Sequence, residues 1–482
     1  MRRTLERFSS TVSQMARVAP VTAFLLPLAP LVLGAATTGC GPSVGAQAPN
    51  RPPLATQWVE RAKASYRAAD FDDARDSAKK ALAAAPNDPD ARELSARIAL
   101  ARLDYADALK FTEGLDSTAA HGLRGRAFWY SGDVEHAADE LETLLADPSV
   151  KDPWARDVAA LARRGAGRHP FEMAGGIVGE VEMPRGIDRV PLGAANVVPC
   201  ELDGERILAL IATGSSEVVL DSTSRHEAAW VSLRFDRLEV NDVPALVTDL
   251  SSVSRQLGVP IKAMLGAQFL RHTHATFDRR GDQFVVRRRE AEPPPEASRV
   301  PLYYLRGGGM VLRATVSTKD DAPIPLFVDS SRPFPILLSD AGWKRAGIDM
   351  STLASSPDAP NVKRGAVPVF RMGGFDLAKI PAIGGVDLGD LTNGQEIDVA
   401  GVVGADLLAF FRVTFADEGR FMWIEPDPTL LGGDQQPDHP APPAPANAPP
   451  ASAPGADLPS PSAPGASLGS PAPQAPPQAS AR

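Results

Sequence analysis

The hydrophobic positions in the first part of the chain recur with a helical period. Trp58, Ala62 and Tyr66 are spaced four residues apart, with charged residues between them. This spacing places the three side chains on one face of an amphipathic helix. The same pattern predicts a second helix over about 71–85, and the Pro-Asn-Asp-Pro that follows ends it. Asp88 within that stop is well placed to cap a third helix.

A helical motif then repeats along the chain. The motif at 69–74 returns at 103–108, a separation of 103 − 69 = 34 residues, and a shortened copy follows at 131–137. A 34-residue helix-turn-helix period resembles tetratricopeptide (TPR) repeats. We therefore expect a TPR-like helical module over 54–169, ending in a capping helix at 154–164. The resemblance implies a concave surface that binds peptides or proteins, and a rigid spacer is the alternative.

The pattern changes to that of strands over 175–288 and 299–427, which a polar, proline-rich linker separates. Short apolar runs are broken there by Gly, Pro, Asn and Asp, which is typical of strands. M-L-G-A-Q-F-L-R-H-T-H-A-T-F-D at 264–278 corresponds to V-V-G-A-D-L-L-A-F-F-R-V-T-F-A at 402–416. The chain is therefore predicted to be a multidomain α + β protein, in which two similar all-β units follow the helices.

The first all-β unit carries a turn between two apolar strands. This stretch, I-L-A-L-I-A-T-G-S-S-E-V-V-L-D at 207–221, contains Ala212, Thr213 and Gly214. Aspartic proteases have an apolar pair followed by Asp-Thr-Gly at such a turn, and the stretch resembles theirs with Ala212 in the place of the catalytic Asp. The resemblance implies a retropepsin-like lobe that is degenerate at its catalytic position.

The second all-β unit carries a weaker copy that keeps the acid. Its stretch, L-F-V-D-S-S-R-P-F-P-I-L-L at 326–338, has Asp329 at the catalytic position and Ser331 in the place of the glycine. The resemblance implies a second retropepsin-like lobe, with Asp329 and the turn hydroxyl of Ser330 as candidate catalytic groups. Hydrogen bonds from Asp329 to its own turn amides are the alternative explanation of this acid.

The chemistry of this family needs two carboxylates about 3 Å apart, one from each lobe, which share one proton. The two turns of this chain offer only one. The first lobe is also shorter, because Ala212 and Val243 are 243 − 212 = 31 residues apart, whereas Asp329 and Ile380 are 380 − 329 = 51 apart. It thus lacks 51 − 31 = 20 residues where such lobes carry a helix and a flap.

The second lobe keeps candidates for both of these features. Residues 339–347 are expected to form a helix, and the polar segment 355–363 is a candidate flap. In the first lobe, Glu217 lies on the strand after the turn, so we do not expect it to replace the missing acid. Asp221 ends the same strand and is expected to cap a turn. A retained fold without catalysis is the state that these features favour.

Three functional hypotheses follow. The first is an aspartyl protease family protein that is catalytically degenerate and serves as a peptide-binding, protein-binding or assembly module. The second is an active aspartic endopeptidase in which Asp329 residues of two chains pair through the second lobe, although the first lobe competes for that surface. The third assigns all binding to the helical repeats and leaves the lobes structural. The oligomeric state is left open.

The start of the chain resembles a bacterial lipoprotein signal. Arginines precede an apolar run, and small residues precede Cys40, which is the order of a secretory signal. Thr37 stands where a lipobox has Leu. The resemblance implies a signal peptide at 1–39, a lipid on Cys40, a flexible tether over 40–53 and export to the cell envelope. An uncleaved anchor and an ordinary signal cut near the same place are the alternatives.

Composition bears on the remaining classes of site. The net charge of −9 and the lack of a long basic run disfavour nucleic acid as a partner. Cys200 is expected to be a small buried residue. His272 and His274 are expected to share one face of a strand, but no Cys or carboxylate cluster completes a metal site, so neither a metal nor another cofactor is predicted. Residues 428–482, rich in Pro, Ala and Ser, are expected to be a disordered tail.

Overall fold

The structure is a computed structural model, and it describes the residues 51–319, 321–357, 359–386, 388 and 397–426. The expected signal peptide, Cys40 with its expected lipid, most of the expected tether and all of the expected tail lie outside these residues, so what the sequence indicates for them stays a prediction. Within the described ranges, none of the helices combines the length and the apolar character that crossing a bilayer requires.

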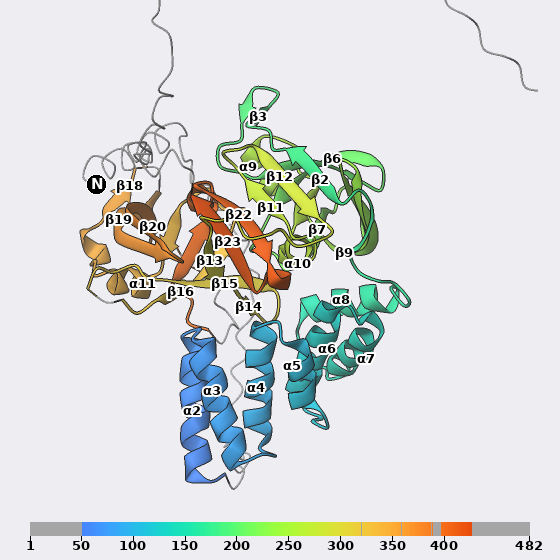
Figure 1. The fold of residues 1–482 in the computed structure, drawn as a ribbon, viewed down its shortest axis with the longest axis vertical. Coiled ribbons are helices and arrows are strands. Elements are labelled where there is room, and N and C mark those ends of the chain that lie inside the picture. The colour runs from blue at the N-terminus through green and yellow to red at the C-terminus, as the bar shows by residue number, and fades with distance from the viewer. Residues whose placement is uncertain (1–50, 320, 358, 387, 389–396, 427–482) are drawn as a thin grey trace, which may run out of the picture. The chain divides into compact units, whose positions relative to one another are not determined.

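Helices form the first part of the described chain, as the hydrophobic period predicts (Figure 1). Ala62 and Tyr66 are buried, whereas Trp58 is only partly buried and lies under the ammonium group of Lys80. Asp88 caps the third helix, as expected. The helices are α2 (Pro53–Arg67), α3 (Phe71–Ala84), α4 (Pro89–Ala101), α5 (Tyr105–Thr112), α6 (Thr118–Ser131), α7 (Val134–Leu145) and α8 (Pro153–Arg163).

One turn conformation occurs three times among these helices. The residue that leads out of the first helix of each pair has a positive φ, which is 53° at Ala69, 63° at Leu103 and 87° at Gly132. In each copy the amide of the following Asp donates to a carbonyl in the last turn of the preceding helix, which closes the helix end. The repeated sequence motif is therefore a repeated turn. We name the three copies turn one (66–71), turn two (100–105) and turn three (129–134).

Three main sheets, with short helices between some of their strands, form most of the rest of the described chain (Figure 1). The first sheet has the order β1-β9-β7-β10-β6-β5-β8, the second β14-β15-β16-β21-β17-β20-β19-β18, and the central sheet β13-β23-β22-β11-β12-β2. A small hairpin joins β3 (Gly186–Ile187) and β4 (Val190–Pro191). Helices in the N-terminal part followed by a β-rich region are thus confirmed.

The strands of the first sheet are β1 (Glu172–Gly175), β5 (Val197–Leu202), β6 (Glu205–Ile211), β7 (Val218–Asp221), β8 (Ala229–Phe235), β9 (Leu238–Thr248) and β10 (Ala263–Leu265). Those of the second are β14 (Tyr303–Leu305), β15 (Gly309–Ala314), β16 (Ile324–Asp329), β17 (Ile336–Leu338), β18 (Ala354–Ser356), β19 (Ala359–Met372), β20 (Phe375–Gly384) and β21 (Gly401–Gly404). Those of the central sheet are β2 (Val178–Glu182), β11 (Thr276–Asp278), β12 (Gln283–Arg287), β13 (Ser298–Pro301), β22 (Phe411–Ala416) and β23 (Phe421–Pro426).

The first and second sheets share one arrangement of strands. In the first, β10 runs parallel to β6 and antiparallel to β7; in the second, β21 runs parallel to β16 and antiparallel to β17. The equivalent strands β11 and β22 meet in the central sheet, where the hydroxyl oxygens of Thr276 and Thr414 are 2.8 Å apart. The two copies of the sequence repeat, which are 414 − 276 = 138 residues apart, thus pair with each other in the central sheet.

The second sheet carries features that the first lacks. The helix α11 (Asp340–Arg345), capped by Ser339, follows β17 and confirms the expected helix. The candidate flap segment contributes to the hairpin of β18 and β19. In the first half, β8 pairs with both β5 and β9 and so closes the sheet. That half also has a short helix that the sequence patterns do not predict, α9 (Ser251–Leu257).

His272 and His274 do not share a strand, so this expectation is wrong. The helix α10 (Ala267–His272) ends at His272, and His274 has a φ of 43° in the turn before β11. The reason is that the apolar residues after Gly266 continue a helix through His272 instead of starting the strand. The His272 ring stacks on Phe171, with the ring centres 4.5 Å apart.

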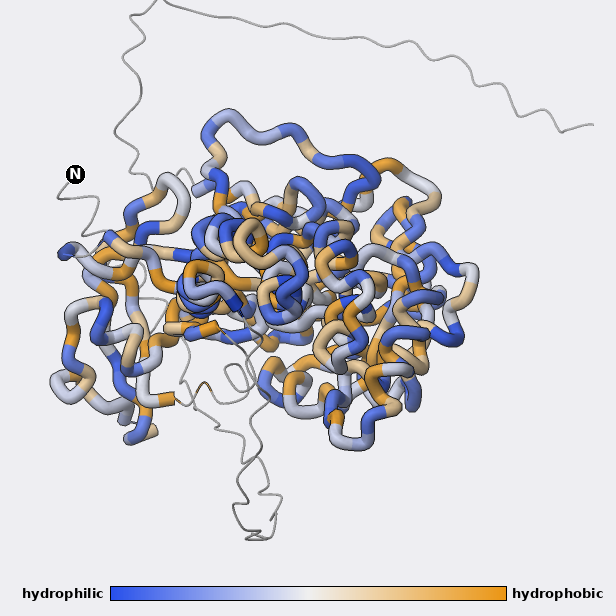
Figure 2. Tube along the Cα trace, turned by 90° about the horizontal axis from the view of Figure 1, so that it is seen from below, coloured by the Kyte–Doolittle hydropathy of each residue, from blue (hydrophilic) through white to orange (hydrophobic). Residues whose placement is uncertain are grey.

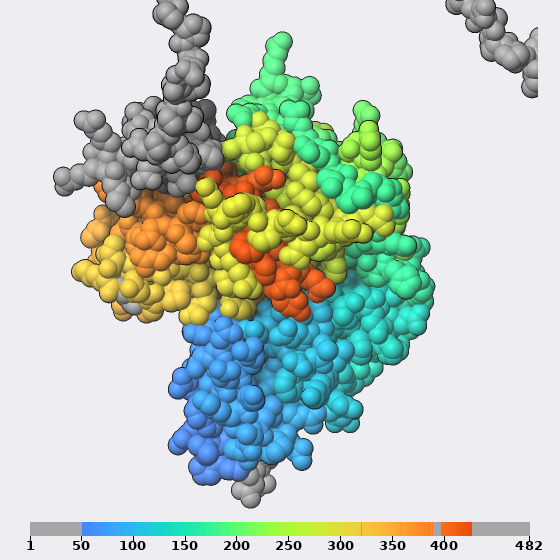
Figure 3. Space-filling model, in the orientation of Figure 1, coloured from blue at the N-terminus to red at the C-terminus, as the bar shows by residue number. Residues whose placement is uncertain are grey.

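Turn one joins the helical module to the second sheet. Phe71 is fully buried, and its ring centre is 4.5 Å from that of Tyr303 on β14. Beside it, the Asp70 carboxylate pairs with the Arg313 guanidinium at 3.2 Å. Figure 3 shows the blue helices in direct contact with the strand-rich part, and Figure 2 shows hydrophobic and hydrophilic positions alternating along the chain. Helices and strands therefore share one apolar core at this contact.

Turn two lies where the two halves of the strand-rich part meet. The Arg420 guanidinium, from the loop before β23, donates to the Leu103 carbonyl at 3.4 Å. The Arg271 guanidinium, from α10, lies 5.6 Å from the centre of the Tyr105 ring. The helical module therefore contacts both halves, and its repeat turns make these contacts.

Candidate functional site

The two turns that the sequence singles out lie against each other, and hydrogen bonds join them reciprocally. The Thr213 hydroxyl donates to the Val328 carbonyl at 3.0 Å and accepts the Ser330 amide at 2.9 Å. The Ser330 hydroxyl donates to the Ile211 carbonyl at 2.8 Å and accepts the Thr213 amide at 3.1 Å. Both hydroxyl groups are buried, so each satisfies one amide and one carbonyl that water does not reach.

Strand pairing gives Ala212 and Asp329 equivalent positions in these turns. Ile211 at the end of β6 pairs with Leu265, and Val328 near the end of β16 pairs with Val403. The next residue in each half is the turn position at which the protease resemblance places an acid. In this chain that residue is the fully buried Ala212 in the first half, so the pair of turns carries the carboxyl of Asp329 alone.

The Asp329 carboxyl is buried and occupied by groups of its own turn. Oδ1 accepts the Ser331 amide at 3.0 Å and the Ser331 hydroxyl at 2.6 Å. Oδ2 accepts from Arg332 Nε at 3.1 Å, although the Arg332 side chain is 57 % exposed. Ser331, which replaces the glycine of the family motif, therefore fits the turn by bonding to the acid. The turn-amide explanation of Asp329 is thus observed, with an ion pair added.

Gly214 allows the two turns to approach this closely. A Cβ atom built on Gly214 would lie 2.6 Å from Cγ of Asp329 and 2.9 Å from each carboxyl oxygen. Real Cβ atoms do not approach other atoms so closely, so a larger residue at 214 would push Asp329 away. Gly214 of the first turn therefore leaves the space that the Asp329 carboxyl of the second turn fills.

Glu217 and Asp221 do not replace that acid. Glu217 lies just before β7 and is 5 % exposed, and its Oε1 accepts from the Tyr130 hydroxyl at 3.2 Å and from Trp154 Nε1 at 2.9 Å. Asp221 caps a turn, as expected, because its Oδ1 accepts the Leu250 amide at 3.2 Å. Glu217 thus bonds to the helical module instead of the paired turns.

A polar network around turn three is a feature that the sequence patterns miss. The Arg271 guanidinium donates to the Tyr130 carbonyl at 2.8 Å and to Gln268 Oε1 at 2.6 Å. Gln268 Nε2 in turn donates to the Gly307 carbonyl at 3.0 Å, in the loop between β14 and β15. The Gly-Gly-Gly run at 307–309 therefore serves as a contact between the helices and both sheets. A signal was present in the sequence, because three glycines in a row permit close packing.

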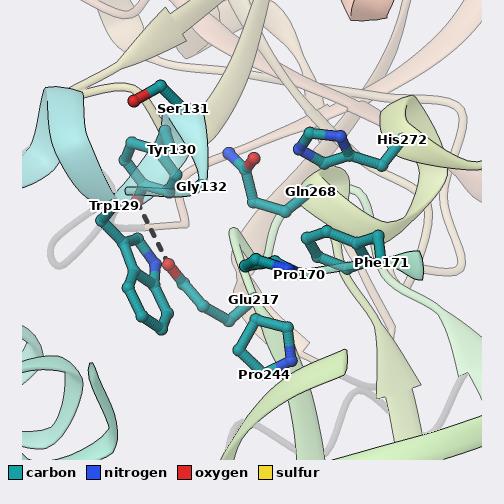
Figure 4. Close-up of a pocket in the computed structure, with 10 residues that line it drawn as sticks. All are labelled: Trp129, Tyr130, Ser131, Gly132, Pro170, Phe171, Glu217, Pro244, Gln268 and His272. Atoms are coloured by element: carbon teal, nitrogen blue, oxygen red, sulfur yellow. Dashed lines mark hydrogen bonds between the residues drawn. The ribbon is translucent and has the colours of Figure 1, made fainter. Parts of the chain in front are cut away.

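A small cavity lies at this junction (Figure 4). Its volume is about 70 Å³, and its lining includes Trp129, Phe171, Glu217, Gln268 and His272. Burial lowers the pKa of His272 well below its usual value, and the positive charge of Arg271 lowers it further. A cavity of this size has room for about two water molecules. Its place between α6 and the first sheet makes it part of the contact between the helices and the strands.

A larger groove lies on the helical module, between α2 and α4. Its volume is about 380 Å³, and both charged and apolar side chains line it. These are Lys63, Tyr66, Arg67, Asp90, Glu93, Leu94 and Arg97. The groove therefore combines cations, anions and the less polar side chains of Tyr66 and Leu94, which are the groups that an extended peptide with charged side chains contacts.

The other candidate groups have structural surroundings. Cys200 is 6 % exposed, and burial raises the pKa of its thiol to about 12, so it is an inert thiol and not a reactive one. Over the residues that the structure describes, no three His, Cys, Asp or Glu side chains are grouped so that they could hold a metal ion.

No protein-family model matches the chain, and neither does any curated protein. Among the solved structures that resemble parts of the fold are a TPR domain and two aspartic proteases. The first TPR of Spaghetti (RPAP3), solved with an HSP90 peptide, is 20 % identical, with 23 % of this chain and 91 % of that one covered and a TM-score of 0.22. A retropepsin-like aspartic protease from Rickettsia conorii is 18 % identical, with 28 % and 95 % covered and a TM-score of 0.21. An aspartic proteinase from Irpex lacteus is 11 % identical, with 53 % and 99 % covered and a TM-score of 0.36.

Proposed function

We propose that this chain is a retropepsin-like protein that does not cleave peptides and that serves as a peptide-binding, protein-binding or assembly module of the cell envelope. One observation carries the proposal. The paired turns hold a single carboxyl, Asp329, whose two oxygens are bonded to Ser331 and Arg332, and Ala212 occupies the equivalent position in the other turn.

The chemical argument concerns a shared proton. In the aspartic protease mechanism two adjacent carboxyls share one proton, so that one accepts a proton from water while the other donates to the peptide carbonyl. A lone Asp329 has no second carboxyl with which to divide these roles. Both of its oxygens already accept hydrogen bonds from Ser331 and Arg332 of its own turn. A retained fold without hydrolysis is the consequence.

The hydrogen bonds between the turns disfavour the alternative, in which two chains pair their Asp329 residues. Thr213 of the same chain already occupies both the amide of Ser330 and the carbonyl of Val328. A second chain would have to break four buried hydrogen bonds and then form equivalent ones. Each buried group left unsatisfied costs about 1–3 kcal/mol, which opposes the exchange.

The groove between α2 and α4 is the binding surface that we propose. It presents Lys63 and Arg67 from one helix and Asp90 and Glu93 from the other. A peptide in extended conformation is the occupant that matches this mixed lining. We further propose that a lipid on Cys40 holds the module at the membrane, because basic, apolar and small residues precede that cysteine in the order of a lipoprotein signal.

Binding of the full chain to a peptide array tests this proposal. We expect the protein to bind a subset of charged peptides, and Lys63→Glu to weaken that binding about tenfold, which is about 1.4 kcal/mol. Glu227→Gln is the matched control, because Glu227 is an exposed acid outside the groove, and it should bind as the unaltered chain does. Equal binding by all three proteins would exclude the groove, and cleavage of the bound peptides would overturn the proposed function.

A further inference from the structure

Glu217 is a buried acid in the contact between the helical module and the first sheet. It follows the Ala-Thr-Gly-Ser-Ser turn and is 5 % exposed. Its Oε1 accepts one hydrogen bond from Tyr130 of α6 at 3.2 Å and one from Trp154 of α8 at 2.9 Å. In Figure 4 its side chain points from the first sheet towards Trp129 and Tyr130. Two helices of the helical module, through residues that lie 87 and 63 positions before Glu217 in the sequence, therefore bond to its carboxyl group.

Ionisable groups face this carboxyl from each element around it. From α6 and the cap of α8, the Arg126 guanidinium pairs with Asp152 at 2.7 Å and lies 4.3 Å from the centre of the Trp154 ring. From α10, His272 lines the same cavity, and Arg271 donates to the Tyr130 carbonyl. Tyr130 is itself buried, and burial raises the pKa of its hydroxyl well above the usual value, so it remains a donor.

The backbone of Glu217 connects this contact to the paired turns. Its carbonyl accepts the Ser215 hydroxyl at 3.0 Å. The same carbonyl packs on Gly266, where a Cβ atom would lie 2.1 Å from the oxygen. A shift of Glu217 therefore also moves residues 215 and 216, because atoms packed this closely cannot move independently.

We propose that Glu217 is a protonation-dependent latch, which holds the third repeat turn of the helical module on the first sheet while it is neutral and releases that contact when it ionises. The contact is between two parts of one chain, and it does not depend on whether the chain cleaves or binds peptides.

The direction of the effect follows from the surroundings of the carboxyl. Burial raises the pKa of Glu217, and this outweighs the hydrogen bonds from Trp154, Tyr130 and Trp129 and the charge of Arg126, which lower it. The docked state therefore has a pKa above the ordinary value of 4.5. Its extra stability is fully present below the undocked pKa and is lost as the pH rises through the docked pKa. Between these two values the docking constant falls about tenfold for each pH unit.

Hydrogen exchange of the full chain measures this release. Deuterium uptake is compared between pH 5 and pH 9 after correction for the intrinsic exchange rate. We expect uptake in α6, in α8 and in the segment 215–221 to rise with pH, while uptake in α2 and α3, which contact the second sheet through turn one, stays constant. Glu217→Gln keeps an oxygen that accepts from Tyr130 and Trp154 but cannot ionise, so the rise should disappear in this variant.

Two further variants keep the outcome decisive. Glu227→Gln, an exposed acid that pairs with Arg164 at 3.4 Å, should keep the rise of the unaltered chain. Tyr130→Phe removes one donor to Glu217 and should shift the rise to another pH without abolishing it, so it replaces Glu217→Gln if that variant does not fold. The same pH dependence in the unaltered chain, Glu217→Gln and Tyr130→Phe would overturn the latch, and so would uptake that rises equally in α2 and α3.

Discussion

Thr213 and Ser330 keep the two turns together, and one of the two turns carries an acid, Asp329. Each hydroxyl satisfies one buried amide and one buried carbonyl of the opposite turn. Position 212 takes no part in this network, because Ala212 contributes none of its four bonds. Hydroxyl groups and backbone groups therefore hold the geometry of the paired turns, and Asp329 supplies their carboxyl.

Ser330→Ala should destabilise the chain strongly. The substitution leaves the Thr213 amide and the Ile211 carbonyl buried without partners, and we expect a loss of about 3 kcal/mol in the free energy of unfolding. Denaturant titration measures it. Ser331→Ala is the control, because its hydroxyl bonds only to Asp329 at the partly exposed side of the turn, and it should cost about 1 kcal/mol. Equal losses would show that the reciprocal bonds do not hold the turns.

Ala212→Asp should make the stability depend on pH. An acid at 212 is buried in the same pair of turns as Asp329, so burial and the like charge raise its pKa in the folded state. The loss in the free energy of unfolding that this raised pKa causes is absent below the pKa of the unfolded state. It grows as the pH rises and reaches about 1.4 kcal/mol for each unit by which folding raises the pKa. Denaturant unfolding at pH 4 and pH 7 measures this loss, with the neutral variant Ala212→Asn as the control. The same change in the free energy of unfolding between the two pH values in both variants would contradict a buried position for residue 212 beside Asp329.

At the scale of elements, each repeat turn has two structural roles. Each turn starts a helix, and each turn also contacts the strands through a residue such as Phe71, Leu103 or Tyr130. The 34-residue period predicts the turns, because it reflects local helix ends. It does not predict the contacts, because Tyr130 and Glu217 are 87 residues apart and meet only after both parts fold.

The sequence also predicts the position of the acid but not its state. The turn motif singles out Asp329 as a candidate, and in the structure it lies in the turn that bonds to the turn of Thr213. That Arg332 and Ser331 occupy its oxygens depends on side-chain rotamers in a loop, which hydrophobic periodicity does not reflect. The misplaced strand at His272 has a different origin, because short apolar runs suit helices and strands alike.

Asp88→Asn should keep the hydrogen bond that caps α4 and remove the negative charge that pairs with Arg51. Burial acts to raise the pKa of Asp88, but the hydrogen bonds from Arg51 and the Ala91 amide lower it overall. The lowered pKa gives stability that is present above the unfolded pKa and is lost as the pH falls through the folded value. Asn also caps a helix well, so the variant should lose about 1 kcal/mol at pH 7 and nothing at low pH. A loss that persists in acid would contradict this assignment. Thermal unfolding at both pH values tests it.

At the scale of the whole described chain, the helices are part of the core of the strand-rich region. One hydrophobic cluster contains residues of α2, α3 and α4 together with Phe327 and Val402 of the second sheet. Another contains Leu103 of turn two beside residues of all three main sheets. A shared core of this kind makes cooperative unfolding the expected behaviour of the described region.

Phe71→Ala should weaken this cooperativity. Phe71 is fully buried against Tyr66 and Tyr303, and its loss should cost about 3–4 kcal/mol. We expect the single calorimetric transition of the unaltered chain to separate into two, with the helices melting first. Trp58→Ala, which removes a partly buried ring on α2, is the control and should keep one transition. Two transitions in the unaltered chain would contradict a shared core.

The absence of peptide cleavage is the central claim of this account, and one measurement tests it most directly. The purified full chain is incubated with an unfolded protein substrate between pH 3 and pH 7, beside Asp329→Asn. We expect no cleavage by either protein, because the paired turns supply a single carboxyl and Arg332 and Ser331 already bind it. Cleavage by the unaltered chain that a statyl-type inhibitor blocks and Asp329→Asn abolishes would contradict the account.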